Sequence, residues 1–207
     1  MPCIIVIGAS AGGVWPLIEL VSALPADLDA AIFIVQHFPT GTRSALCDIL
    51  NRNGALRSAP PFDGQEILSR RIYVAPSNDH HMVIGHRRVR LVASEKEHSF
   101  RPAIDLLFRS AAAAYGSNAI GILLSGLGGD GVAGLQSIQT AGGISIVQDP
   151  REARFPGLPT AARAAMRVDY CLPIKAIAAL LLFLAVQQRG EREVLQSPAG
   201  HFALQSA

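Results

Sequence analysis

The amino-acid sequence predicts an α/β domain in which parallel strands alternate with helices. Short apolar runs rich in β-branched residues, typical of buried strands, occur at residues 3–7, 31–35 and 119–125. The segment at residues 14–24 instead repeats its apolar residues with the period of a helix. Half of the 207 residues are hydrophobic and 16% are charged, so the chain can bury the core of one sizeable domain.

The remaining elements follow from the same patterns. Further strands are expected at residues 71–76 and 144–148, and further helices at residues 44–50, 132–140, 160–166 and 174–189. A helix that begins within residues 99–105, with Pro102 in an early helical position, runs to Tyr115. Two short runs joined across residues 85–87 predict a small β-hairpin, at residues 81–84 and 88–92.

The whole of residues 1–189 is expected to form one domain, followed by a polar, mobile tail at residues 190–207. The net charge of +2 is too small to favour nucleic acid or an anionic membrane as a partner. The most apolar stretch, residues 176–186, is too short to span a bilayer, and no signal peptide precedes the first strand. These features predict a cytoplasmic protein without membrane insertion.

The cysteine and histidine content favours neither disulfides nor a metal. Cys3, Cys47 and Cys171 are odd in number and widely spaced, which predicts reduced thiols. His80 and His81 lack a third ligand at metal spacing, so they are interpreted as polar loop residues. No cofactor and no metal ion are expected.

The first strand leads into Gly8-Ala9-Ser10-Ala11-Gly12, which fits the pattern G-x-S-x-G. A serine on such a strand-to-helix turn projects its hydroxyl beyond the sheet edge, and the turn's N–H groups with the helix N-terminus can stabilise an oxyanion. Ser10 is therefore a candidate nucleophile. A phosphate-binding turn and a tightly packed structural turn remain open as alternatives.

Two further strand ends supply the other groups that a serine hydrolase needs. His37 follows the second strand, and a histidine at that edge is a candidate general base. Asp130 follows the strand at residues 119–125 in a loop with four glycines, where it can orient a histidine. A helix N-cap or a Mg²⁺ ligand are the alternatives for Asp130. Parallel strands bring Ser10, His37 and Asp130 to one edge, which favours serine hydrolase chemistry.

Five ordered motifs, spread over residues 4–180, resemble the catalytic domain of CheB-type chemoreceptor methylesterases. They are I-G-A-S-A-G-G at residues 7–13, Q-H at residues 36–37, Y-V-A-P at residues 73–76, R-P-A-I-D at residues 101–105 and S-G-L-G-G-D-G at residues 125–131. The resemblance implies a three-layer α/β/α fold with a mostly parallel, doubly wound sheet. It places the family's catalytic serine, histidine and aspartate on Ser10, His37 and Asp130.

The resemblance also implies the reaction and its partners. The substrate would be the γ-glutamyl methyl esters of methyl-accepting chemoreceptor helices, releasing methanol, with deamidation of receptor glutamines as a second activity. The expected oxyanion donors are the backbone N–H group of Ala11 and that of Leu127 or a neighbouring glycine. Arg101 is a candidate contact to the substrate, with a surface salt bridge as the alternative. No receiver domain precedes the first strand. The activity would then either be unregulated by phosphorylation in this chain or be controlled by a separate or fused regulatory or methyltransferase partner.

Three positions depart from the pattern of many family members. Ala11 stands where threonine is common, Leu127 where methionine is common, and Phe100 where histidine is common. The Ala11 N–H survives this change, although a hydroxyl contact is lost. Two other functions stay open: the same chemistry on a methylated protein outside chemotaxis, or a nucleotide- or phosphate-binding module with Mg²⁺ at residues 126–131.

Overall fold

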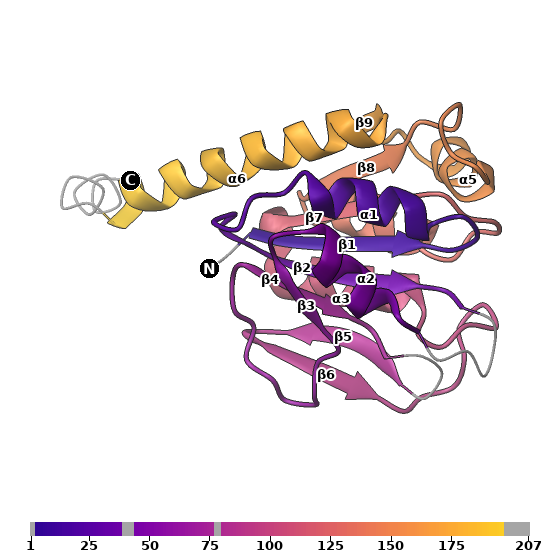
Figure 1. The fold of residues 1–207 in the computed structure, drawn as a ribbon, viewed down its shortest axis with the longest axis horizontal. Coiled ribbons are helices and arrows are strands. Elements are labelled where there is room, and N and C mark those ends of the chain that lie inside the picture. The colour runs from indigo at the N-terminus through magenta and orange to yellow at the C-terminus, as the bar shows by residue number, and fades with distance from the viewer. Residues whose placement is uncertain (1–2, 39–43, 77–79, 197–207) are drawn as a thin grey trace.

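A computed structural model describes residues 3–38, 44–76 and 80–196, with side chains described up to residue 187 (Figure 1). A seven-stranded sheet runs through the middle of the molecule in the order β3-β4-β2-β1-β7-β8-β9, and all of its pairs are parallel. Its strands are β1 (Cys3–Ala9), β2 (Ala30–Gln36), β3 (Arg57–Ala59), β4 (Arg71–Val74), β7 (Ala119–Leu123), β8 (Ile144–Gln148) and β9 (Tyr170–Leu172). The predicted hairpin is confirmed as a separate antiparallel pair, β5 (His81–Gly85) and β6 (Arg88–Val92).

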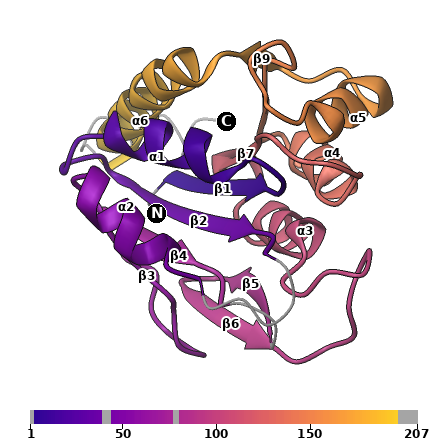
Figure 2. The same cartoon turned by 45° about the vertical axis from the view of Figure 1, so that its right-hand side comes forward.

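Helices cover both faces of the sheet, as the doubly wound topology requires (Figure 2). The helices are α1 (Val14–Ser22), α2 (Leu46–Asn53), α3 (Ile104–Tyr115), a short 3₁₀ helix (Gly116–Asn118), α4 (Val132–Thr140), α5 (Gly157–Ala165) and α6 (Ile174–Gln196). Helices α1, α2 and α6 pack on one face, while α3, α4, α5 and the hairpin pack on the other. The three-layer α/β/α expectation is therefore confirmed.

The alternating side chains of β1 explain why two separate cores form. Ile5 and Ile7 belong to the core beneath α1, α2 and α6, whereas Ile4 and Val6 belong to the core beneath α3 and α4. A strand buried on both faces needs an unbroken apolar run, which residues 3–7 provide. Strand β1 lies where the strand order changes side: β2, β4 and β3 are on one side of it, and β7, β8 and β9 are on the other. Open α/β sheets hold their sites at the carboxyl ends of the strands next to such a point.

Helix α3 begins later than predicted. Its first residue is Ile104, after an irregular segment in which Ala103 is extended and the Arg101–Pro102 peptide bond is cis. The carboxylate of Asp130 accepts the N–H groups of Ile104 and Asp105, so the helix start is fixed by a residue far along the chain. The early helical position predicted for Pro102 is wrong for this reason.

His81 is also placed differently from its predicted role as a polar loop residue. It lies fully buried at the start of β5, where Nδ1 accepts the Ala103 N–H at 3.1 Å and Nε2 lies 2.9 Å from the Glu95 carbonyl oxygen. His81 thus ties the hairpin to the segment that leads into α3. Its Nδ1 satisfies the buried N–H group of Ala103, which would otherwise lack an acceptor.

The end of the domain differs as well. Helix α6 continues to Gln196, seven residues past the predicted end at residue 189, and helix-forming Glu and Arg residues after Gly190 carry it on. Residues 197–207 of the predicted tail, and residues 39–41 of the loop after the second strand, lie outside the described residues. Among the helices that the structure describes, none has the length and apolar content needed to cross a bilayer.

Candidate active site

Ser10 lies directly after the central strand β1. Its N–H donates to the Ser125 carbonyl oxygen at 3.0 Å, and its own carbonyl oxygen accepts the Gly13 N–H at 3.0 Å. Helix α1 begins one residue later, at Val14. These bonds fix the predicted strand-to-helix turn and leave Ser10 partly exposed at the sheet edge.

Ser125, just beyond β7, joins three loops around this turn. Its Oγ donates to the Ala11 carbonyl oxygen at 2.9 Å and accepts the Phe155 N–H at 3.1 Å. Its own N–H donates to Oε1 of Gln148 at 2.9 Å. Because Ser125 is fully buried, these bonds hold the Ser10 turn without competition from water.

Gly126 passes so close to Ser10 that a side chain cannot fit between them. A Cβ atom at Gly126 would lie 2.9 Å from Cβ of Ser10 and 3.1 Å from Cδ2 of Leu158. The glycine therefore lets the loop after β7 approach the Ser10 turn directly.

We expect Gly126→Ala to displace Ser10 or α5, and to lower the free energy of unfolding by about 1–3 kcal/mol, the usual cost of overpacking. Gly129→Ala in the same loop is the matched control, since a Cβ there meets nothing within 4 Å. Denaturant unfolding of both variants measures this; equal stability of the two would contradict the steric argument.

His37 follows β2, the neighbour of β1, and its position is fixed through Gln36. The buried Gln36 amide Nε2 donates to the carbonyl oxygens of Ser10, at 2.8 Å, and of His37, at 2.7 Å. The His37 N–H also donates to the Ala9 carbonyl oxygen at 3.0 Å. The ends of the two strands are therefore held side by side, and the His37 ring is 95% buried between them and its neighbours.

Asp130 meets the His37 ring from the loop after β7. Its Oδ2 lies 3.0 Å from Nε2 of His37, and both side chains are almost fully buried. The same carboxylate accepts the Ile104 N–H at 2.8 Å and the Asp105 N–H at 2.9 Å. The first N–H groups of α3 thus fix the carboxylate and favour its negative charge, which can stabilise an imidazolium.

Phe100 covers the remaining face of His37. The two rings stack with their centroids 3.7 Å apart and their planes 5° from parallel. Phe100 stands where many relatives of the resembled family have histidine, and it presents an equally flat ring. Together with Asp130, the stack restricts the rotation of the His37 imidazole, so Phe100 acts as a positioning residue.

Replacing Phe100 by leucine is expected to lower kcat by about 3- to 10-fold with little change in KM, because an aromatic pair contributes about 0.5–1.5 kcal/mol. Phe100→His should restore most of the rate, since it returns a planar ring. Phe62→Leu is the control, because Phe62 is a largely exposed phenylalanine. A Phe100→Leu enzyme with wild-type kcat would rule out the positioning role.

The remaining predicted site residues lie in the same loops. Among the described residues, the backbone N–H groups of Ala11 and Leu127 donate no hydrogen bond, as an oxyanion site requires. The Leu127 side chain is 56% exposed. Arg101 follows Phe100, and its Nη1 donates to the Ser94 carbonyl oxygen at 2.8 Å.

Burial shifts the pKa values of Asp105 and Cys47. Burial raises the pKa of Asp105, although the Gly134 N–H that its carboxylate accepts acts in the opposite direction. Burial also raises the pKa of the Cys47 thiol, which keeps it in the less nucleophilic form. Cys47 and Cys171 are free thiols.

The fold and this arrangement define a class: doubly wound α/β proteins that gather a serine, a histidine and an aspartate at the carboxyl edge of the sheet. The family model described as CheB methylesterase matches residues 5–181. The chain belongs to the CheB methylesterase family.

Individual relatives agree with this assignment. A protein-glutamate methylesterase/protein-glutamine glutaminase of Bordetella parapertussis is 36% identical over 91% of this chain and 55% of its own length. A protein of the same name from Sulfurimonas denitrificans is 38% identical over 84% of this chain and 50% of its own length. The chain thus spans about half the length of these curated relatives. The crystal structure of the Thermotoga maritima CheB methylesterase catalytic domain matches with a TM-score of 0.84 and 32% identity, covering 89% of this chain and 99% of that one.

Proposed function

We propose that this chain is the catalytic unit of a protein-glutamate methylesterase, with Ser10 as nucleophile, His37 as general base and Asp130 as its orienting acid. The observation that carries the proposal is the buried 3.0 Å approach of Asp130 to His37, next to a serine on the adjacent strand. The names of the relatives support the same activity.

The proton path follows from which ring nitrogen faces the carboxylate. Nε2 of His37 lies against Asp130, which keeps the hydrogen on that nitrogen. Both ring nitrogens are buried, and neither has a partner in hydrogen-bond geometry among the described residues. Because Nε2 faces the Asp130 carboxylate at 3.0 Å, Nδ1 is the nitrogen left to accept the Ser10 proton. Asp130 then stabilises the imidazolium that forms.

Ester hydrolysis proceeds in two steps on these groups. Ser10 Oγ attacks the glutamyl ester carbonyl, the Ala11 and Leu127 N–H groups receive the oxyanion, and the leaving methoxide takes the proton from His37 to depart as methanol. Water then gives its proton to His37 as it attacks the acyl-enzyme, and His37 passes that proton to Ser10 Oγ as the acyl bond breaks and the glutamate is released. A glutamine side chain follows the same path with ammonia as the leaving group, which is the proposed second activity.

The proposed substrate is the methylated cytoplasmic helix of a chemoreceptor, with Arg101 as a candidate contact to its acidic surface. A cytoplasmic location and control by a separate or fused regulatory or methyltransferase partner complete the proposal. A nucleotide-binding role for the Gly8–Gly13 turn is not favoured, because a histidine stands after β2 where a ribose-binding acid would be expected.

The test is release of labelled methanol from a receptor cytoplasmic fragment methylated with a tritiated methyl group. We expect release from this fragment and none from a protein methylated on lysine, whose C–N bond the chemistry does not cleave. Ammonia release from the glutamine form of the fragment measures the second activity. A folded chain that releases methanol from no glutamyl methyl ester would contradict the proposal.

A further inference from the structure

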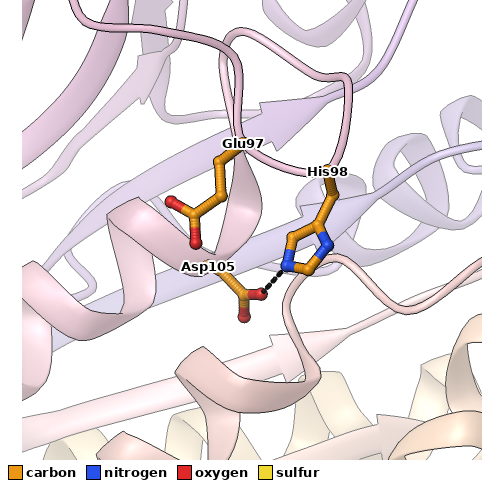
Figure 3. Close-up of side chains that lie close together, drawn as sticks. All are labelled: Glu97, His98 and Asp105. Carbon is orange, nitrogen blue, oxygen red and sulfur yellow. Dashed lines mark ion pairs between the residues drawn. The ribbon is translucent and has the colours of Figure 1, made fainter.

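A second cluster of polar side chains lies next to the active site, on the segment between β6 and α3 and on α3 itself (Figure 3). Glu97 and His98 come from this segment, and Asp105 comes from the first turn of α3. One potential ligand atom from each of the three lies within 4.8 Å of the other two. The closest pair is Nε2 of His98 and Oδ2 of Asp105, at 3.0 Å.

The carboxylate of Asp105 is buried but only half satisfied. The residue has no exposed surface, and its Oδ1 accepts the Gly134 N–H at 2.6 Å. Its Oδ2 has no hydrogen-bond partner among the described residues, although it points at His98 (Figure 3). A buried carboxylate oxygen without a donor is costly, and a cation between Oδ2 and the imidazole would remove that cost.

The local charge also favours a cation. Of the two carboxylates in the cluster, that of Glu97 pairs with Arg109, at 2.7 Å between Nη2 and Oε2, and that of Asp105 faces His98. A metal ion bound here would meet both carboxylates, and their charge favours a positive ion.

We propose that Glu97, His98 and Asp105 bind a first-row divalent metal ion of the zinc type, with water in a fourth position. Tetrahedral zinc with bonds of about 2.0–2.1 Å places neighbouring ligand atoms about 3.3 Å apart, close to the separation between His98 and Asp105. The Glu97 carboxylate reaches the ion by a rotation of its flexible side chain. An imidazole among few ligands favours zinc over Mg²⁺ or Ca²⁺, which take more oxygen ligands.

A metal ion at this site would hold two segments that position active-site side chains. The segment that supplies Glu97 and His98 also carries Phe100, which stacks on His37. The first turn of α3 that supplies Asp105 holds the Asp130 carboxylate through its N–H groups. The ion would therefore tie together the two elements that position His37.

The test is calorimetric titration of zinc chloride into chelator-treated protein. We expect one zinc ion per wild-type chain, and binding at least about 10-fold weaker in His98→Ala and in Glu97→Gln. His98 is half exposed, so its removal does not threaten the fold. His86→Ala, a histidine on the hairpin turn, is the matched control and should bind like the wild type. Equal binding by wild type and His98→Ala would overturn the proposal, as would no binding by either.

Two further measurements test which side chains bind the metal ion. Co²⁺ in place of zinc should give a visible d–d absorption band without the intense thiolate charge-transfer band that Cys47 or Cys171 would produce; a thiolate band would overturn the assignment.

Arg109→Gln removes the cation that competes for Glu97, so zinc should bind about 10-fold more tightly. If Arg109→Gln leaves the affinity unchanged or weaker, Glu97 is not a ligand. Both readouts are independent of esterase activity.

Discussion

Replacement of Ser10 by alanine is expected to lower kcat for methyl-ester hydrolysis by about 10⁴- to 10⁶-fold, because members of a catalytic triad act as a unit. The fold should be unaffected. The hydrogen bonds that place Ser10 use its backbone N–H and carbonyl groups, and alanine keeps both. Methanol release and thermal unfolding, measured on the same preparation, test the two statements together.

Ser22→Ala is the matched control for this variant. Ser22 is an exposed serine on α1 whose Oγ donates to the Glu19 carbonyl oxygen, so its loss should leave kcat unchanged. The assignment of Ser10 fails if the Ser10→Ala protein, folded as the wild type, still hydrolyses the ester within 10-fold of the wild-type rate.

The second large effect is expected for Asp130→Asn, with a loss in kcat of about 10⁴-fold. An amide cannot stabilise the imidazolium, and its NH₂ group allows the His37 ring to adopt the tautomer with the hydrogen on Nδ1. That tautomer cannot accept the Ser10 proton. Stopped-time assays of methanol release at several pH values measure the loss.

Asp130→Asn is also expected to lower the free energy of unfolding. The carboxylate accepts two N–H groups at the start of α3, and an amide can replace only one of these acceptors. Asp27→Asn, at an exposed position after α1, is the control and should change neither kcat nor stability. Wild-type kcat in Asp130→Asn would exclude Asp130 as the partner of His37.

The central elements of the fold were predictable because their signal is local. Strands β1 and β2 are buried on both faces, so their apolar runs stand out in the sequence. Strands β3 and β9 were not predicted, because each has only three residues at an edge of the sheet and its pairing is set by a neighbour. The start of α3 was missed for a similar reason, since Asp130 and not a nearby residue satisfies its first N–H groups.

Some residues of the candidate site could likewise be predicted from the sequence, and others could not. Ser10, His37 and Asp130 could be selected from the sequence because each follows a recognisable strand, and parallel strands end at a common edge. The contact between Phe100 and His37 had no such signal, because it joins two irregular segments. His80 and His81 are neighbours in the sequence but have no third ligand at metal spacing. The proposed metal cluster instead combines Glu97 and His98 with Asp105 on the following helix, which only the fold brings together.

The central place of β1 has a consequence for the order in which the protein is made. One edge of β1 pairs with β2, which follows closely, but the other waits for β7 at residue 119. During synthesis the growing chain therefore holds an apolar strand with one open edge, the arrangement most prone to pairing with another molecule. Asp130 emerges later still, so a ribosome-bound chain that has not yet reached it carries Ser10 and His37 without the acid. Until β7 and Asp130 have been made, the nascent chain is therefore most prone to aggregate and lacks the acid of the proposed triad.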